Sequence, residues 1–294
     1  MLETIFYHVD NFCKEFEKFE QKTLLNNGKK RSPNKGRMCL SEVMTICILY
    51  HYSKRKNFKA YYEEDVMQNL QGEFKLVSYN RFIELKQKAM LPLFLFSTII
   101  SKQNCKENIY IIDSYPLKVC HNKRISQNKV FRNLAKRGKS SMGWFFGFKL
   151  HIVINHLGEI VAFSITTGNV ADNNNELVKN LMDGLSGKLF GDKGYISAEL
   201  FEDLWEKGIH LVTKIRENMK NKLMEIYDKL LLRKRGVIES VGNILKNIYN
   251  LEHTRYRNPV NFFVNIFSTI TAYFFKENKP KILKQEVAYL KTFC

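Results

Sequence analysis

The sequence predicts an α/β fold in which a mixed five-stranded sheet with flanking helices lies between a helical N-terminal region and a helical tail. Two observations predict it. The middle of the chain alternates short apolar runs, typical of strands, with amphipathic helical segments. The residues on either side carry apolar side chains at helical spacing instead. We therefore expect a helical region at 1–105, an α/β core at 106–250 and a helical C-terminal tail at 251–294.

Residues 1–105 contain three predicted short helices, SEVMTICILYHY, NFKAYYEEDVMQNL and YNRFIELKQKAM, the last of them capped by Ser78. Six basic residues lie on or beside these helices: Lys54, Arg55, Lys56, Arg81, Lys86 and Lys88. Three short helices with this charge form either a helix-turn-helix-like DNA-binding region or the ordinary packing helices of an α-rich protein. The charge favours contact with DNA.

The core is predicted to begin with the apolar run ENIYIID, followed by the strands WFFGFKLHIVIN and GEIVAFSITT around a turn. KLFGD and IHLVTKI are the fourth and fifth strands, with helices at 174–185 and 197–208 before them. Two hairpin-linked strands followed by β-α-β-α units describe a mixed sheet with helices packed on it. Further helical spacing runs from Leu223 to Leu231, and another helix from about Arg233 to Tyr249.

The charge of the chain restricts its partners. Lys and Arg number 47 against 29 Asp and Glu, which gives a net charge of +18 at pH 7. Such an excess indicates a polyanionic partner, either nucleic acid or an anionic membrane surface, unless it reflects only a lysine-rich proteome. The apolar run AMLPLFLFSTII is too short to span a bilayer, so we expect no membrane association. Nucleic acid is therefore the favoured partner.

The six cysteines lack the spacing of a zinc site, and the N-terminus lacks the apolar stretch of a signal peptide. Scattered cysteines in such a chain are typical of reduced thiols. We therefore expect a cytoplasmic protein, associated with the nucleoid.

Three acidic residues stand out by their positions. Asp113 ends the buried run IYIID, and Asp192 follows another strand in KLFGDKGY. Glu239 lies in RKRGVIESVGNILKNIY, where Arg235 and Lys246 fall within about 40° of it on a helical wheel. Taken singly, each aspartate is typical of a turn or a helix cap, and the glutamate of a solvated ion-pair face.

The order of the three acids favours a different interpretation. An acid on the first strand, one on the fourth strand and one on a late helix is the layout of an RNase H-like nuclease sheet. Phosphodiester displacement uses two divalent ions about 4 Å apart, which activate the attacking oxygen and stabilise the leaving oxygen. Mg²⁺ prefers carboxylate oxygens over nitrogen or sulfur ligands, which explains why acids are needed.

With these motifs in place, the sequence resembles the DDE transposases of bacterial insertion sequences. The likeness lies in IIDSYPL, in GDKGY and in the spacing R-x3-E-x6-K formed by Arg235, Glu239 and Lys246. Leu232 stands where the family signature has a tyrosine, which weakens the case for a DNA contact by that side chain. The segments SEVMTICILYHY and ITTGNVADN are similar to the insertion sequence 982 family.

The resemblance implies DNA strand cleavage and transfer at the ends of a mobile element. Asp113, Asp192 and Glu239 would be the catalytic residues and would bind two Mg²⁺ ions, for which Mn²⁺ can substitute. Arg235 and Lys246 would contact the DNA backbone near the cleavage point, with Lys193 as a weaker candidate. The implied partners are the terminal inverted repeats and target DNA, both double-stranded, held by a homodimer.

From Ser114 to Gly158 the chain contains no Asp or Glu and nine basic residues. Those chosen as candidate DNA contacts are Lys123, Arg124, Lys136, Arg137 and Lys139. Phosphates lying across them would relieve their mutual repulsion and release counterions. The alternative is a flexible, solvated loop. Two further residues have open interpretations: Trp144 is either a core residue or a base-stacking platform, and Asp172 either a helix cap or a fourth acid at the site.

Two rival functions are consistent with the same residues. One is an RNase H-like DNA nuclease without strand transfer, and the other is a non-enzymatic DNA-binding relic of a transposase. A shared metal site also makes a geometric prediction. Asp113 and Asp192 must lie on adjacent strands, with Glu239 reaching them from a helix packed on the sheet, and at least one acid should have a raised pKa or be turned aside.

Overall fold

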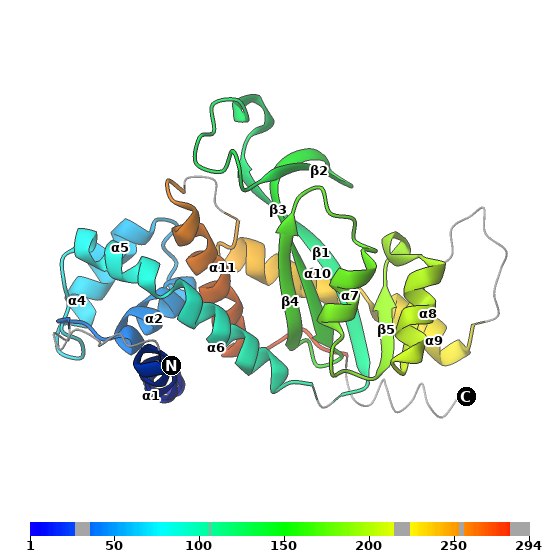
Figure 1. The fold of residues 1–294 in the computed structure, drawn as a ribbon, viewed down its shortest axis with the longest axis horizontal. Helices are drawn as coiled ribbons and strands as arrows, with labels where there is room; N and C mark the ends of the chain where they lie inside the picture. Colours follow the sequence, from blue (N-terminus) through cyan, green and yellow to red (C-terminus); the bar gives the residue numbers. More distant parts are fainter. Residues whose placement is uncertain (27–35, 106, 215–223, 253–255, 283–294) are drawn as a thin grey trace. The chain divides into compact units, whose positions relative to one another are not determined.

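The computed structural model describes residues 1–26, 36–105, 107–214, 224–252 and 256–282, and Figure 1 shows its fold. The chain forms two compact units. The first unit is made of residues 1–99, 248–251 and 256–275, and the second of residues 100–247, 252–255 and 276–294. Each unit is therefore built from segments that are far apart in the sequence.

The first unit is helical. Its main helices are α1 (Leu2–Asn26), α2 (Leu40–Leu49), α5 (Tyr79–Lys88), α6 (Met90–Lys102), which continues into the second unit, and α11 (Pro259–Phe274). Between α2 and α5 lie the short segments η1 (Tyr50–Tyr52), α3 (Phe58–Ala60), the π-helical η2 (Tyr61–Val66) and α4 (Met67–Asn69). The three helices predicted for this region are thus confirmed, the second of them with a π-helical middle.

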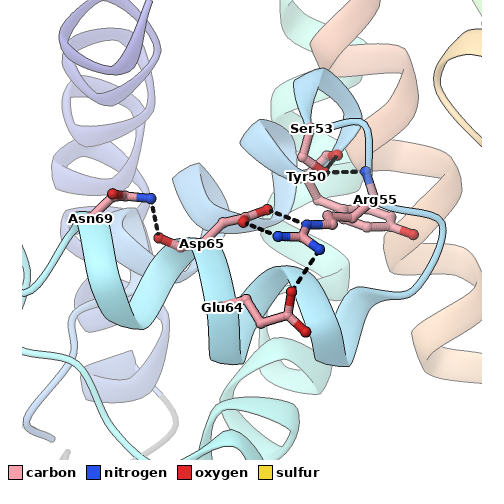
Figure 2. Close-up of polar contacts among 6 residues, drawn as sticks. All are labelled: Tyr50, Ser53, Arg55, Glu64, Asp65 and Asn69. Atoms are coloured by element: carbon pink, nitrogen blue, oxygen red, sulfur yellow. Dashed lines mark hydrogen bonds and ion pairs between the residues drawn. The ribbon is translucent and has the colours of Figure 1, made fainter.

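Several basic side chains of the first unit are used inside it. Figure 2 shows Arg55, whose guanidinium donates to Asp65 at 2.9 and 3.1 Å and pairs with Glu64 at 2.6 Å. Lys86 is buried, with its ammonium 3.7 Å from the centre of the Phe58 ring. The interpretation of Lys86 as part of a DNA-facing surface is therefore wrong, because its charge is enclosed by the helices that it connects.

The second unit contains, among the described residues, a six-stranded sheet rather than the five strands predicted. The strands are β1 (Ile109–Cys120), β2 (Lys136–Ser140), β3 (Gly143–Asn155), β4 (Ile160–Thr167), β5 (Gly187–Gly191) and β6 (Ile209–Thr213). β1 and β3 are antiparallel, and β4 is antiparallel to β3. On the other side of β1 come β5 and then β6, both parallel to their neighbours.

The extra strand, β2, comes from the basic stretch. Its sequence KRGKS has no apolar alternation, so periodicity did not mark it as a strand. It forms by antiparallel pairing with the first residues of β3, from Gly143 to Gly147. The solvated-loop interpretation is therefore wrong for residues 136–140, which are held in the sheet.

Helices cover both faces of the sheet. Tyr110 and Ile112 pack with side chains of α7 (Asn175–Leu181) and α8 (Ala198–Glu206) in one apolar core. The alternate residues of β1 point to the opposite face, because side chains of a strand alternate. There α10 (Val237–Asn243) packs on β1, and α9 (Ile226–Lys234) packs on β5 and β6.

The late helix predicted from Arg233 to Tyr249 is not continuous. α9 ends at Lys234, Arg235 and Gly236 form a turn, and α10 is followed by the π-helical η5 (Ile244–Ile248). Arg235 therefore precedes the helix that carries Glu239. Leu223 and residues 283–294 of the predicted tail lie outside the described residues. None of the helices described is long and apolar enough to cross a membrane.

Candidate active site

Asp113 lies in the middle of β1, not at its end as predicted. Antiparallel pairing with β3 continues past it to Cys120, so the strand is longer than its apolar run. The side chain is half-buried, and its Oδ1 accepts a hydrogen bond from the backbone N–H of Ser114 at 2.8 Å. The acid is thus held on the sheet face that α10 covers.

Asp192 follows β5 directly and is exposed. In the parallel pairing of β1 and β5, Ile111 is the partner of Phe190. Asp113 and Asp192 each come two residues after this pair, so they lie at the same level of neighbouring strands. The prediction that these two acids belong to adjacent strands is confirmed.

Glu239 lies in the first turn of α10 and is joined to Asp192 through a shared cation. Nη2 of Arg235 is 3.7 Å from Oδ1 of Asp192 and 3.7 Å from Oε1 of Glu239. The arginine side chain is only 14% exposed, against 53% for Asp192 and 67% for Glu239. The guanidinium therefore sits inside the site, with the two carboxylates on its solvent side.

A close contact seats α10 on the sheet. The hydroxyl of Tyr115, on β1, donates to the backbone oxygen of Ile238 at 2.6 Å. A Cβ on Gly242 would come within 2.3 Å of the Tyr115 ring, so only glycine leaves room for this approach. This packing fixes the helix that carries Glu239 against the strand that carries Asp113.

The pKa of Asp113 is raised from its ordinary value of 3.8 to about 6. Burial is the largest cause, and the negative charges of Asp192 and Asp172 add to it. The N–H of Ser114 and the positive charge of Arg235 lower the pKa in opposition. The expected raised pKa of one acid is confirmed, although burial contributes more to it than repulsion between carboxylates.

The donors at this site suit a hard divalent cation, but they are not gathered around one point. Within the described ranges, no three His, Cys, Asp or Glu side chains lie close enough to hold a metal ion together. The carboxylate oxygens of Asp113, Asp192 and Glu239 are the ligand type that Mg²⁺ prefers. The buried hydroxyl of Tyr195, whose pKa the charges of Asp113 and Asp172 help to raise, has no hydrogen-bond partner in the structure. The chemistry fits a metal, while the guanidinium of Arg235 supplies the positive charge that the acids meet.

Lys246 and Lys193 differ in what they contact. Lys246 donates to the backbone oxygen of Pro116 at 3.2 Å, pairs with Glu252 at 3.7 Å and lies over the Tyr115 ring. It therefore runs along β1, beyond Asp113. Lys193 begins η4 (Lys193–Tyr195), the turn after Asp192, and is exposed.

The basic stretch contributes an exposed, uncompensated surface. Lys123 and Arg124 lie in η3 (Asn122–Arg124), and Lys136, Arg137 and Lys139 lie in β2; all five are exposed. None of the five forms an ion pair with another described residue. Trp144 is 59% exposed at the start of β3, so its interpretation as a core residue is wrong. In Figure 1 the chain between β1 and β2 projects beyond the sheet.

Asp172 is not a helix cap, because the side chain of Asn174 caps α7 instead. Its carboxylate accepts from the buried ammonium of Lys149 at 2.9 Å, and its charge acts on Asp113. Sequence reasoning missed Lys149 and His151 as parts of this site. The available signal was their position: both interrupt the apolar strand WFFGFKLHIVIN, and His151 is fully buried.

Comparisons with known proteins agree with this arrangement of residues. The sequence model of the transposase DDE domain family matches residues 103–259. A cryo-EM structure of a piggyBac transposase synaptic complex with hairpin DNA is similar over 90% of this chain and 73% of its own, with a TM-score of 0.45 and 10% identity. A comparison with curated protein sequences finds no match. Because the family match covers more than half of the 294 residues, the chain belongs to the transposase DDE domain family.

Proposed function

We propose that this transposase cleaves DNA strands at the ends of an insertion sequence and transfers them to target DNA. The observation that carries the proposal is the placement of Arg235 at 3.7 Å from both Asp192 and Glu239, beside the strand that holds Asp113. Three acids from β1, from the end of β5 and from α10 thus share one electrostatic environment. The order of the strands, a three-stranded antiparallel meander followed by two parallel strands, supports an RNase H-like core.

Asp113, Asp192 and Glu239 would hold two Mg²⁺ ions, with Mn²⁺ as a substitute. When bound, the metal activates the attacking oxygen and stabilises the leaving oxygen of the phosphodiester. The residues of the chain have their own tasks. Ser114 N–H orients the carboxylate of Asp113, Tyr115 and Gly242 seat α10, and Arg235 keeps the charges of Asp192 and Glu239 apart from bulk water.

Double-stranded DNA is the proposed partner. The net charge of +18 and the five exposed cations of the basic stretch, Lys123, Arg124, Lys136, Arg137 and Lys139, support it. Arg235, Lys193 and Lys246 are proposed to contact the DNA backbone nearer to the cleavage point. The proposal includes a homodimer that holds two ends and membership of the insertion sequence 982 group.

A strand-transfer assay tests this function against its two rivals. The full chain is mixed with a labelled terminal repeat, supercoiled target DNA and Mg²⁺ or Mn²⁺. The proposal predicts labelled DNA joined to the target. Cleaved ends without joined product would favour an RNase H-like nuclease, and bound but intact ends would favour a non-enzymatic relic.

A further inference from the structure

The carboxylate of Asp172 lies between the two aspartates proposed to bind metal. Its charge raises the pKa of Asp113, which places it near β1. A Cβ built on Gly194 would lie 3.9 Å from Oδ2 of Asp172, so this oxygen faces the turn that follows Asp192. The loop between β4 and α7 therefore brings a fourth acid to the same end of the sheet.

Lys149 holds one oxygen of this acid and leaves the other one available. Its buried ammonium donates to Oδ1 of Asp172 at 2.9 Å and to the backbone oxygen of Val170 at 2.8 Å. Oδ2 of Asp172 has no hydrogen-bond donor among the residues that the structure describes. Lys149 is on β3, the neighbour of β1, so the carboxylate is oriented by the sheet itself.

Two buried polar groups beside Asp172 point independently to a missing ligand. The hydroxyl of Tyr195, in a side chain only 2% exposed, has no partner and lies in the field of Asp113 and Asp172. Nδ1 of His151, on a fully buried ring, also has no partner, and Asp172 acts on that ring. Buried polar groups without a partner are costly, so groups of this kind indicate a site completed by a bound species.

We propose that Asp172 is a fourth carboxylate ligand of the divalent-cation site, oriented by Lys149. This inference rests on the proposed function, because it assumes that Asp113 and Asp192 bind the cation. Oδ2 of Asp172 contributes a hard oxygen of the type that Mg²⁺ and Mn²⁺ prefer. Lys149 acts as a positioning residue, since it fixes the rotamer of Asp172 without touching the cation.

Binding of Mn²⁺ to the full chain, measured by electron paramagnetic resonance without DNA, tests the assignment. Asp172→Asn should weaken Mn²⁺ binding at least about tenfold, in the range that loss of metal-supporting groups produces. Asp183→Asn, which removes the same charge from an exposed position after α7, is the matched control and should leave binding unchanged. Equal affinities for the Asp172→Asn variant and the wild type would overturn the proposal.

Lys149→Met tests the positioning role by the sign of its effect. Removal of a cation that served only as a counter-charge would strengthen Mn²⁺ binding, since the acids would be less neutralised. Loss of the positioning contact should weaken it instead. Lys179→Met, which breaks the Lys179–Asp203 pair on the same unit, is the control. Stronger binding by the Lys149→Met variant would overturn the positioning role.

Two further measurements keep the result interpretable. Asp192→Asn should abolish Mn²⁺ binding; unchanged binding in that variant would refute the metal site of the proposed function itself, apart from any role of Asp172. Iron-mediated backbone cleavage of the wild-type chain needs no variant that must fold. Cuts beside Asp172 as well as beside Asp113 and Asp192 support the proposal, and cuts beside only the latter two overturn it.

Discussion

The guanidinium of Arg235 lies 3.7 Å from the carboxylate of Asp192, although the arginine ends α9 and the aspartate follows β5. The same guanidinium is 3.7 Å from Glu239 and lowers the pKa of Asp113. One positive charge is thus common to the three acids. It occupies the environment in which the proposed mechanism needs cations, which makes Arg235 the residue that balances the site before metal and DNA bind.

Replacement of Arg235 should shift the pH dependence of the reaction. In Arg235→Gln the pKa of Asp113 rises above its value of about 6, because the lowering charge is lost. The carboxylate needed for metal binding then forms only at higher pH, so the pH profile of Mn²⁺-dependent cleavage should move upward. Arg233→Gln removes an equal charge from an exposed position of α9 and should leave the profile in place. A profile of Arg235→Gln that matches the wild type would argue against the shared-charge account.

Asp113 should reduce stability at neutral pH. Its folded pKa of about 6 exceeds the ordinary 3.8, so the folded protein keeps a proton that the unfolded chain has lost. Stability is therefore present below about pH 4 and is lost as the pH rises through about 6. Asp113→Asn should raise the free energy of unfolding at pH 7 on the order of 1–3 kcal/mol, with no gain near pH 3.

Urea unfolding without divalent cations, at both pH values, measures this difference. Asp192→Asn serves as the comparison, since its carboxylate is exposed and should give a smaller change. A destabilised Asp113→Asn variant at pH 7 would show that the charged carboxylate is not a cost to the fold.

The two glycines around α10 should respond oppositely to alanine. In Gly242→Ala the new Cβ meets the Tyr115 ring at 2.3 Å, and overpacking of this kind costs about 1–3 kcal/mol. Gly236 has nothing within 4 Å of a built Cβ and a helical φ of −54°, so Gly236→Ala should be neutral or stabilising by about 0.4–1 kcal/mol. Urea midpoints of the two variants check the contrast. Similar losses in both would mean that the Tyr115 contact does not seat the helix.

Neutralisation of the basic strand should change the salt dependence of DNA binding. The triple variant Lys136→Gln, Arg137→Gln and Lys139→Gln loses up to three phosphate contacts, each worth about 0.9 in the slope of log K against log salt. The control removes the same charge from exposed lysines elsewhere on the second unit, at Lys207, Lys229 and Lys281. Titrations of a labelled duplex over a range of salt concentrations measure both slopes, and an equal slope in the triple variant and the wild type would remove this strand from the DNA surface.

Periodicity predicted much of the second unit because its strands are apolar and its helices amphipathic. Helices α7 and α8, with their caps Asn174 and Ser197, follow directly from local sequence signals. β2 did not, because KRGKS becomes a strand only through pairing with β3. The pairing of a segment with a distant partner leaves no trace in its own composition.

The candidate site shows the same limit. Asp113 and Asp192 could be recognised because each follows apolar residues of a strand, and Glu239 because of its spacing from Arg235 and Lys246. The break at Gly236 was hidden, since a single glycine within a helical pattern is often tolerated. Lys149 and Asp172 meet only because β3 and the loop after β4 are neighbours in space, which the interpretation of each segment alone could not reveal.

Metal-dependent cleavage by variants of the three acids tests the central claim most directly. Asp113→Asn, Asp192→Asn and Glu239→Gln keep the shape of each side chain but remove one charge, and Asp183→Asn is the exposed control. Cleavage of a labelled terminal repeat is measured in Mg²⁺ and in Mn²⁺, with duplex binding measured in parallel. The account predicts that each of the three variants loses cleavage by at least about a hundredfold while it binds DNA like the control. Near-normal cleavage by any one of them would contradict the three-carboxylate mechanism.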